Sequence, residues 1–151
     1  MKSYDVCIVG ASIAGNYLSY LLSDISLEIA VIEEHEAIGL PFECAGIISQ
    51  KLAELINLPS ELVLNRVKVA KIVAPSGKYI NLSGEERPYI VDRVALDRLF
   101  YEKVRDNSHF THFLGEKFKS FRYEEEGRRK MVLIDTSKRK IKARMLIGCD
   151  G

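Results

Sequence analysis

The feature that most constrains the fold of this chain is a glycine-rich turn between a short apolar run and a helical pattern. Residues 6–9 are continuously apolar, as expected for a strand buried on both faces of a parallel sheet. The run ends at Gly10, and residues 10–15 read G-x-S-x-x-G. Apolar side chains then recur with helical spacing at Ile13, Tyr17, Leu18, Leu21 and Leu22. A strand, a glycine turn and a helix in this order begin a βαβ unit.

A second apolar run at residues 27–32 completes the unit, and the acidic pair Glu33-Glu34 follows it. In a dinucleotide fingerprint the first glycine permits the tight turn and the last permits close packing of helix on strand. The helix N-terminus offers free N–H groups and a positive dipole to a pyrophosphate. Glu33 lies 18 residues beyond Gly15, where an acidic side chain accepts hydrogen bonds from ribose hydroxyls. We therefore expect an α/β protein that binds a dinucleotide.

Ser12 departs from the usual fingerprint, because the middle position is where the backbone and the pyrophosphate approach closely. A serine adds one hydroxymethyl group, which either points away or donates a hydrogen bond to a phosphate. The alternative is a parallel α/β protein with a glycine turn and no nucleotide. FAD and NAD(P) share the fingerprint, so this segment alone does not separate them.

The rest of the chain departs from a simple repeat of the βαβ unit. Residues 35–49 are loop-like, and residues 67–73 and 78–82 flank a Pro-Ser-Gly turn as a hairpin. Helices are predicted near residues 50–56 and 96–104, and a strand at 89–92. Residues 117–123, 130–135 and 138–143 predict an antiparallel meander, and 145–147 a last buried strand that leads into Gly148–Gly151.

Composition excludes several classes of protein. With 151 residues and 47% apolar side chains, the chain is expected to form one globular domain over residues 1–151. Cys7, Cys44 and Cys149 have no CxxC spacing, so neither a disulfide framework nor a metal site is predicted, and a reducing cytoplasm fits best. The uncharged residues 6–23 include six Gly, Ser or Asn and divide at Gly10, which argues against a membrane span or a signal peptide.

The charges divide unequally along the chain, since residues 1–65 hold 2 basic and 9 acidic side chains while residues 66–151 hold 20 and 12. Such a basic half raises the question of nucleic-acid binding. Its basic side chains between residues 117 and 142 alternate with apolar ones, as on the outer face of strands. We therefore expect no nucleic-acid partner.

Three further segments resemble the geranylgeranyl reductase family of flavoproteins. Residues 38–49, IGLPFECAGIIS, are similar to that family's IGxPxxCxGxxS segment. Residues 89–99, YIVDRVALDRL, are similar to its YxxxRxxFDxxL stretch, with Leu96 in place of the usual Phe. Residues 145–151, MLIGCDG, resemble its xxIGADG segment, with Cys149 in place of Ala. Together with the glycine turn, these segments follow the family's order from the first strand to the last residue.

The resemblance implies FAD as the cofactor and a Rossmann-like FAD-binding domain with a central parallel sheet and an antiparallel β-meander. It assigns residues to three parts of the cofactor. The pyrophosphate would be held by Gly10, Ser12, Ile13, Ala14 and Gly15 and by a second loop beginning at Asp150 and Gly151, while Arg93 would offset phosphate charge. The adenosine ribose would be held by Glu33, with Glu34 beside it. Cys44, Ala45 and Gly46 would lie on the flavin side of the loop.

Two of these residues have an alternative interpretation. Cys44 is the only catalytic candidate, as a redox or flavin-contacting thiol, but free cysteines also occur as small buried apolar residues. Arg93 can instead pair with Asp97, one helical turn later. Cys7, on the first strand, is expected in the core. The three histidines form no catalytic triad and no metal spacing.

The resemblance further implies an oxidoreductase that saturates isoprenoid double bonds by hydride transfer from reduced FAD. Its substrate would be a lipid, with the whole protein in the cytoplasm or peripheral to a membrane. The family's later flavin motif and lipid-binding domain match nothing here, so we expect an N-terminal part that is inactive alone. The alternatives are a related FAD-dependent monooxygenase, a quinone-linked flavoprotein, and a nucleotide-binding module without catalysis.

Overall fold

The computed structural model describes residues 2–42, 44–127 and 129–151. Glu43, part of the reductase-like segment, and Arg128, one of the basic side chains, lie outside the described residues. The chain divides into two compact units, which are described separately. The first comprises Met1–Pro41 and Asp97–Gly151, and the second comprises Phe42–Leu96.

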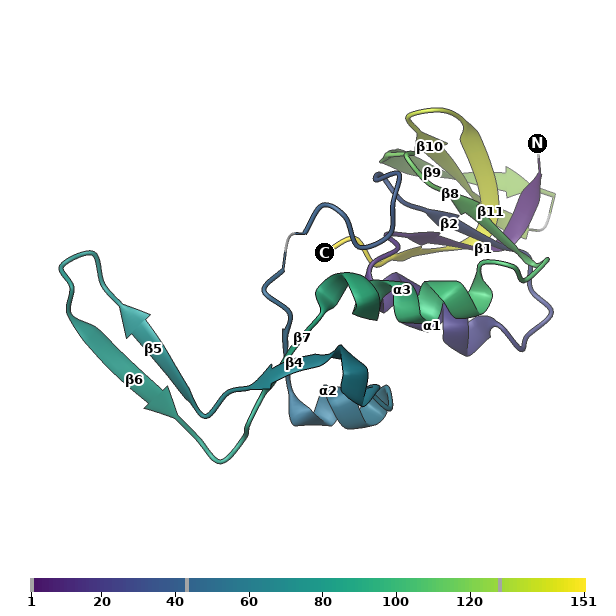
Figure 1. The fold of residues 1–151 in the computed structure, drawn as a ribbon. Coiled ribbons are helices and arrows are strands. Elements are labelled where there is room, and N and C mark those ends of the chain that lie inside the picture. The colour runs from purple at the N-terminus through teal and green to yellow at the C-terminus, as the bar shows by residue number, and fades with distance from the viewer. Residues whose placement is uncertain (1, 43, 128) are drawn as a thin grey trace. The chain divides into compact units, whose positions relative to one another are not determined.

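The first unit is built on a six-stranded sheet (Figure 1). Its strand order is β8 (Phe110–Phe113), β2 (Ile29–Ile32), β1 (Ser3–Val9), β11 (Lys140–Gly148), β10 (Arg129–Thr136) and β9 (Phe118–Glu126). The pairs β8–β2, β2–β1 and β1–β11 are parallel, whereas β11–β10 and β10–β9 are antiparallel. The predicted α/β fold, with a central parallel sheet and an antiparallel meander, is confirmed.

Helices α1 (Ile13–Leu22) and α3 (Arg93–Val104) lie on one face of this sheet (Figure 1). Leu18 and Leu22 of α1 pack with Tyr101 of α3 against a buried cluster that includes Ile8 and Val31. Apolar side chains on one side of each helix thus find the face of the parallel strands, as the periodicity predicted.

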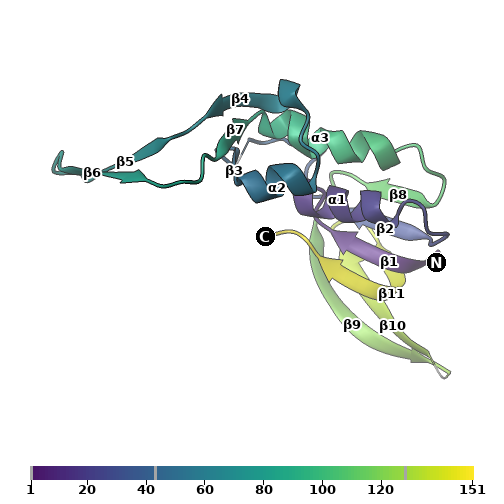
Figure 2. The ribbon, with the colours of Figure 1, turned by 90° about the horizontal axis from the view of Figure 1, so that it is seen from below.

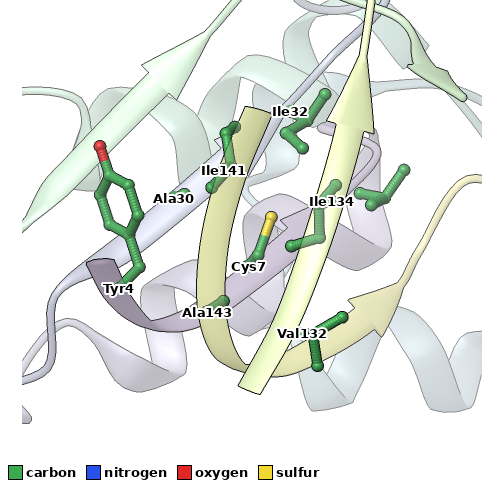
Figure 3. Packing of buried hydrophobic residues seen from close by; sticks show 9 residues of the cluster. Tyr4, Cys7, Ala30, Ile32, Val132, Ile134, Ile141 and Ala143 are labelled. Carbon is green, nitrogen blue, oxygen red and sulfur yellow. The ribbon is translucent and has the colours of Figure 1, made fainter. Parts of the chain in front are cut away.

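On the opposite face, the parallel strands share a buried cluster with the meander strands of the same sheet (Figure 3). Cys7 and Ala30 of the parallel strands share a buried cluster with Ile134, Ile141 and Ala143. Cys7 is fully buried, which confirms the core position predicted for it. Burial also raises the pKa of its thiol to about 12, because the thiolate loses its hydration there.

The strand prediction was wrong in two places within this unit. The strands predicted at residues 138–143 and 145–147 are not separate, because residues 140–143 and 145–147 both belong to the single strand β11. The ladder continues because β11 pairs with β10 as far as Ala143 and with β1 from Lys142 to Gly148. Met145 in its second part is 54% exposed, so this part is not fully buried. Strand β8 was missed, since only four residues carry its signal.

The second unit holds two small antiparallel sheets. Strands β3 (Ile47–Ile48), β7 (Tyr89–Val91) and β4 (Val63–Arg66) form one, beside α2 (Gln50–Leu55) and a 3₁₀ turn at Ser60–Leu62. The other is the hairpin of β5 (Val69–Val73) and β6 (Tyr79–Ser83), visible in Figure 2. This confirms the predicted hairpin, the helix near residues 50–56 and the strand near 89–92. Strands β3 and β4 were not predicted.

Candidate nucleotide-binding site

The glycine turn lies where the direction of strand connection changes in the sheet. Strand β1 has β2 on one side and β11 on the other, and both neighbours run parallel to it. The carboxyl ends of β1 and β11 therefore open onto the same edge, which is the usual ligand-binding crevice of a doubly wound sheet. The backbone N–H of Cys149 donates to the Val9 carbonyl over 2.7 Å, so the two loops that follow these strands are joined.

Gly10 is required at the first position of the turn for two reasons. Its φ is +94°, a left-handed conformation that a side chain disfavours. A Cβ at this position would also lie 2.6 Å from the Cys149 carbonyl oxygen and 2.9 Å from Cα of Asp150. The first glycine of the fingerprint thus allows the loop around Asp150 to approach the turn, although these residues are far apart in sequence.

Gly15 packs against the start of the same turn. A Cβ here would overlap the Gly10 carbonyl oxygen and would lie 3.4 Å from Cγ2 of Ile8. The helix therefore approaches β1 at a distance that only glycine permits. This is the packing role that the fingerprint predicts for its last glycine.

Glu33 contacts the turn directly, which the sequence did not predict. Its side chain is 12% exposed. Oε2 accepts a hydrogen bond from the backbone N–H of Ala11 over 2.8 Å, and Oε1 accepts one from the backbone N–H of His35 over 3.0 Å. The His35 ring nitrogen Nδ1 also lies 2.8 Å from Oε1. Glu33 thus fixes the turn. Each carboxylate oxygen has more than one acceptor position, so these hydrogen bonds leave Glu33 able to accept others. Its contact with a ribose stays a prediction.

Glu34 points elsewhere, as the alternation of side chains along a strand suggests. It is exposed and forms an ion pair with Lys117, whose Nζ lies 2.6 Å from Oε2. The hydrogen bond from Lys117 lowers the pKa of Glu34, because the ammonium stabilises the carboxylate. Its place among the cofactor-binding residues stays a prediction.

The N-terminus of α1 leaves adjacent amides available. Ser12 is the N-cap residue, and its carbonyl accepts the first intrahelical hydrogen bond from the N–H of Asn16 over 2.9 Å. Its side chain does not cap the helix. In the described part of the chain, no acceptor contacts the N–H groups of Ile13, Ala14 and Gly15. Three successive amides at the positive end of a helix suit an anion such as a pyrophosphate.

The Ser12 hydroxyl contacts a carboxylate on another helix. Its Oγ lies 3.2 Å from Oδ1 and 3.3 Å from Oδ2 of Asp97 in α3. Asn16 adds a second link, since its Nδ2 donates to the carbonyls of Ala11 and Asp97. The side chains of Asn16 and Asp97 are both buried. Neither Asn16 nor Asp97 was predicted to have a role in the turn. Asp97 lies on the same apolar helical stripe as Phe100 and Val104, and this position was a signal that its side chain is buried.

The remaining predicted residues lie in the second unit. Cys44 is exposed, so the interpretation of it as a buried apolar residue is wrong. Ala45 is exposed too, and Gly46 is buried with φ +68°. A Cβ on Gly46 would lie 2.5 Å from the Val91 carbonyl oxygen. Arg93 begins α3. The contact of these residues with a flavin, and the pairing of Arg93 with Asp97, stay predictions.

Among the described side chains, no group of three or more His, Cys, Asp or Glu is placed to hold a metal ion. None of the helices in the described ranges has the length and apolar character needed to cross a membrane.

Comparison with known proteins identifies relatives of the same kind as the sequence suggested. Digeranylgeranylglycerophospholipid reductase of Methanococcus vannielii is 38% identical over 98 residues, which are 64% of this chain and 25% of the relative. The enzyme of that name numbered 1 in Methanococcoides burtonii is 31% identical over 104 residues, 66% of this chain and 26% of its own length. The chain thus spans about a quarter of the curated relatives it matches. The resemblance to geranylgeranyl reductases is confirmed.

Solved structures share the fold. A geranylgeranyl bacteriochlorophyll reductase-like protein of Thermoplasma acidophilum superposes with a TM-score of 0.73 at 23% identity, covering 100% of this chain and 40% of its own. Residues 3–151 match the family model described as the FAD binding domain. A glycine turn at the switch point of a mixed sheet, with free amides on its helix, is the arrangement such a domain requires. The chain therefore belongs to the FAD-binding domain family.

Proposed function

We propose that this chain is the FAD-binding part of an oxidoreductase that reduces isoprenoid double bonds of a lipid. The observation that carries the proposal is the glycine turn at the carboxyl edge of β1 and β11, with the amides of Ile13, Ala14 and Gly15 available. Its supporting context is the similarity to relatives named digeranylgeranylglycerophospholipid reductase. When bound, FAD would supply the hydride that saturates the double bond.

The residues of the turn fit the adenosine half of FAD. The three amides would bind the pyrophosphate oxygens, with the positive end of the helix dipole adding to the attraction. Gly10 and the adjoining Asp150–Gly151 loop would leave room for the backbone to approach the phosphates. Glu33, already fixed by Ala11, would accept hydrogen bonds from the ribose hydroxyls, so its orientation would be set before the cofactor arrives.

The roles at the flavin end rest on the resemblance. Cys44, Ala45 and Gly46 would lie beside the isoalloxazine ring, and Arg93 would offset phosphate charge. The exposure of Cys44 supports a thiol that is available to a ligand, because packing does not explain its position. We propose that the whole protein acts in the cytoplasm, on a lipid at a membrane surface and as a peripheral protein.

A flavin-dependent monooxygenase is the second candidate. Aklavinone-11 hydroxylase, whose structure contains FAD and aklavinone, superposes with a TM-score of 0.73 at 16% identity, covering 98% of this chain and 33% of its own. The residues at 41–44 favour the reductases, since they match that family's segment. The whole protein separates the two candidates. A reductase would consume a geranylgeranyl lipid without oxygen, whereas a monooxygenase would need oxygen and leave a hydroxylated product.

Titration of the 151-residue chain with ADP, FMN and FAD tests the nucleotide site directly. We expect ADP and FAD to bind with similar and weak affinity, since only the ADP half of the cofactor finds its contacts in the turn. FMN, which lacks the adenosine, should bind less tightly than ADP. A preference for FMN would overturn the proposal.

A further inference from the structure

We propose that Asp97 is a positioning residue for the phosphate-binding turn, because it holds the hydroxyl of Ser12 and so prevents Ser12 from capping its own helix. This inference rests on the proposed nucleotide-binding function and assigns a role to a residue outside the fingerprint. It starts from the one position where the fingerprint is irregular, the serine in place of the middle glycine.

A serine at a helix N-cap normally accepts a hydrogen bond from the backbone N–H two or three residues later. For Ser12, those donors are the N–H groups of Ala14 and Gly15. They are two of the three amides that a pyrophosphate would use. A capping serine would therefore compete with the ligand for the same donors, a conflict that glycine avoids because it has no side chain.

In the structure, the hydroxyl is directed to α3 instead. Ser12 makes no side-chain capping bond, and its Oγ lies 3.2 and 3.3 Å from the two carboxylate oxygens of Asp97. Asp97 is 4% exposed, so water does not readily replace this contact. The amides of Ala14 and Gly15 stay available as a result.

Asn16 fixes the distance between the turn and Asp97. Its Nδ2 donates over 2.5 Å to the Ala11 carbonyl and over 3.0 Å to the Asp97 carbonyl, and its side chain is fully buried. The opposite amide orientation would place Oδ1 against these two carbonyl oxygens, which are both acceptors. Asn16 thus has one orientation, and it ties the backbone of Asp97 to the turn independently of the carboxylate. Substitution of Asp97 removes the hydroxyl contact without removing this link.

The experiment compares two neutral variants of Asp97 in two backgrounds. Asp97→Asn keeps an acceptor for the Ser12 hydroxyl, whereas Asp97→Ala does not, and both remove the negative charge. With Ser12 present, we expect Asp97→Ala to bind ADP about fivefold more weakly than Asp97→Asn, which corresponds to one N-cap hydrogen bond. In a Ser12→Ala background, which cannot cap the helix, the two Asp97 variants should bind ADP equally.

Each alternative gives a different result. An equal loss in both backgrounds would show that Asp97 acts without Ser12, and a loss in Asp97→Asn as large as in Asp97→Ala would show that charge matters rather than position. A merely structural role would lower the urea midpoint of unfolding without this dependence on background. Failure of the unmodified chain to bind ADP would refute the proposed function and not this inference.

A second measurement needs no nucleotide. Amide hydrogen exchange followed by NMR should show little protection at Ala14 and Gly15 in the unmodified chain, and increased protection at one of them in Asp97→Ala. If Asp97→Ala does not fold, Asp97→Leu fills the same buried space without an acceptor and takes its place. Unchanged exchange at both amides would overturn the inference.

Discussion

Replacement of Glu33 by alanine tests the anchor of the glycine turn through both stability and ligand binding. The substitution removes the acceptor of the Ala11 N–H, which lies in a residue that is 1% exposed. A buried donor left without a partner costs about 1 to 3 kcal/mol of folding free energy. The His35 N–H also loses its acceptor, but His35 is half-buried and its N–H can turn to water. We therefore expect a destabilisation of about 1 to 3 kcal/mol, from one hydrogen bond rather than two.

The same substitution should weaken ADP binding by about 1 to 3 kcal/mol, the range for losing charge-assisted hydrogen bonds to ligand hydroxyls. Urea unfolding measures the first effect and calorimetric titration with ADP the second. Glu34→Ala is the matched control, because Glu34 is the next residue, is exposed and forms an ion pair with the exposed Lys117. It should change neither quantity by much. Equal losses of ADP affinity in the two variants would mean that the ribose acceptor has been misassigned, and an unchanged stability of Glu33→Ala would refute the role in the turn.

Three further predictions concern other parts of the chain. Gly15→Ala should destabilise the fold by about 3 kcal/mol or more in urea unfolding, because the new Cβ overlaps the Gly10 carbonyl oxygen. Gly84→Ala is the control, because a Cβ there meets nothing within 4 Å, and it should change the free energy of unfolding by no more than about 0.5 kcal/mol. A similar loss of stability in both variants would contradict the packing argument. In the folded chain at pH 8, Ellman's reagent should modify the exposed Cys44 first and the buried Cys7 last, because burial raises the pKa of Cys7 to about 12. Rapid labelling of Cys7 before unfolding would show that the sheet opens. The pKa of Asp5 is lowered, first by the backbone N–H of Glu28 and then by the side chain of Arg144. The stability that the Asp5 carboxylate contributes is therefore complete above the pKa of the unfolded carboxyl and is lost as the pH falls through the lower pKa of the folded state. Asp5→Asn should flatten that part of the acid unfolding curve, and an unchanged curve would count against these contacts.

Much of the first unit was predictable because its signals are local. A continuous apolar run, a glycine turn and helical spacing all lie within residues 6–32, and each follows from steric and burial rules over a few positions. The continuity of β11 was not predictable in the same way. Arg144 interrupts its apolar pattern, and the strand persists only because β1 pairs with residues on the far side of that arginine.

In the candidate site, too, the local features were predictable and the contacts between distant residues were not. The fingerprint predicted which glycines are required, and Gly10 and Gly15 are required for the reasons that it gives. The acceptors around the turn come from residues distant in sequence, since Glu33 is 22 residues from Ala11 and Asp97 is 85 from Ser12. No local pattern identifies such partners. Only the fold determines that these two carboxylates meet the turn.

These two carboxylates decide which donors of the turn remain for a ligand. The N–H of Gly10 is bonded to the Ile32 carbonyl, the N–H of Ala11 to Glu33, and the Ser12 hydroxyl lies against Asp97. Within the described residues, the amides at positions 13–15 are left without an acceptor. Two negative groups beside an anion site would ordinarily weaken it by repulsion. Here Glu33 holds the Ala11 N–H in the turn, and Asp97 holds the Ser12 hydroxyl away from the amides that it would otherwise cap. The remaining three amides and the helix dipole would then act together on one ligand.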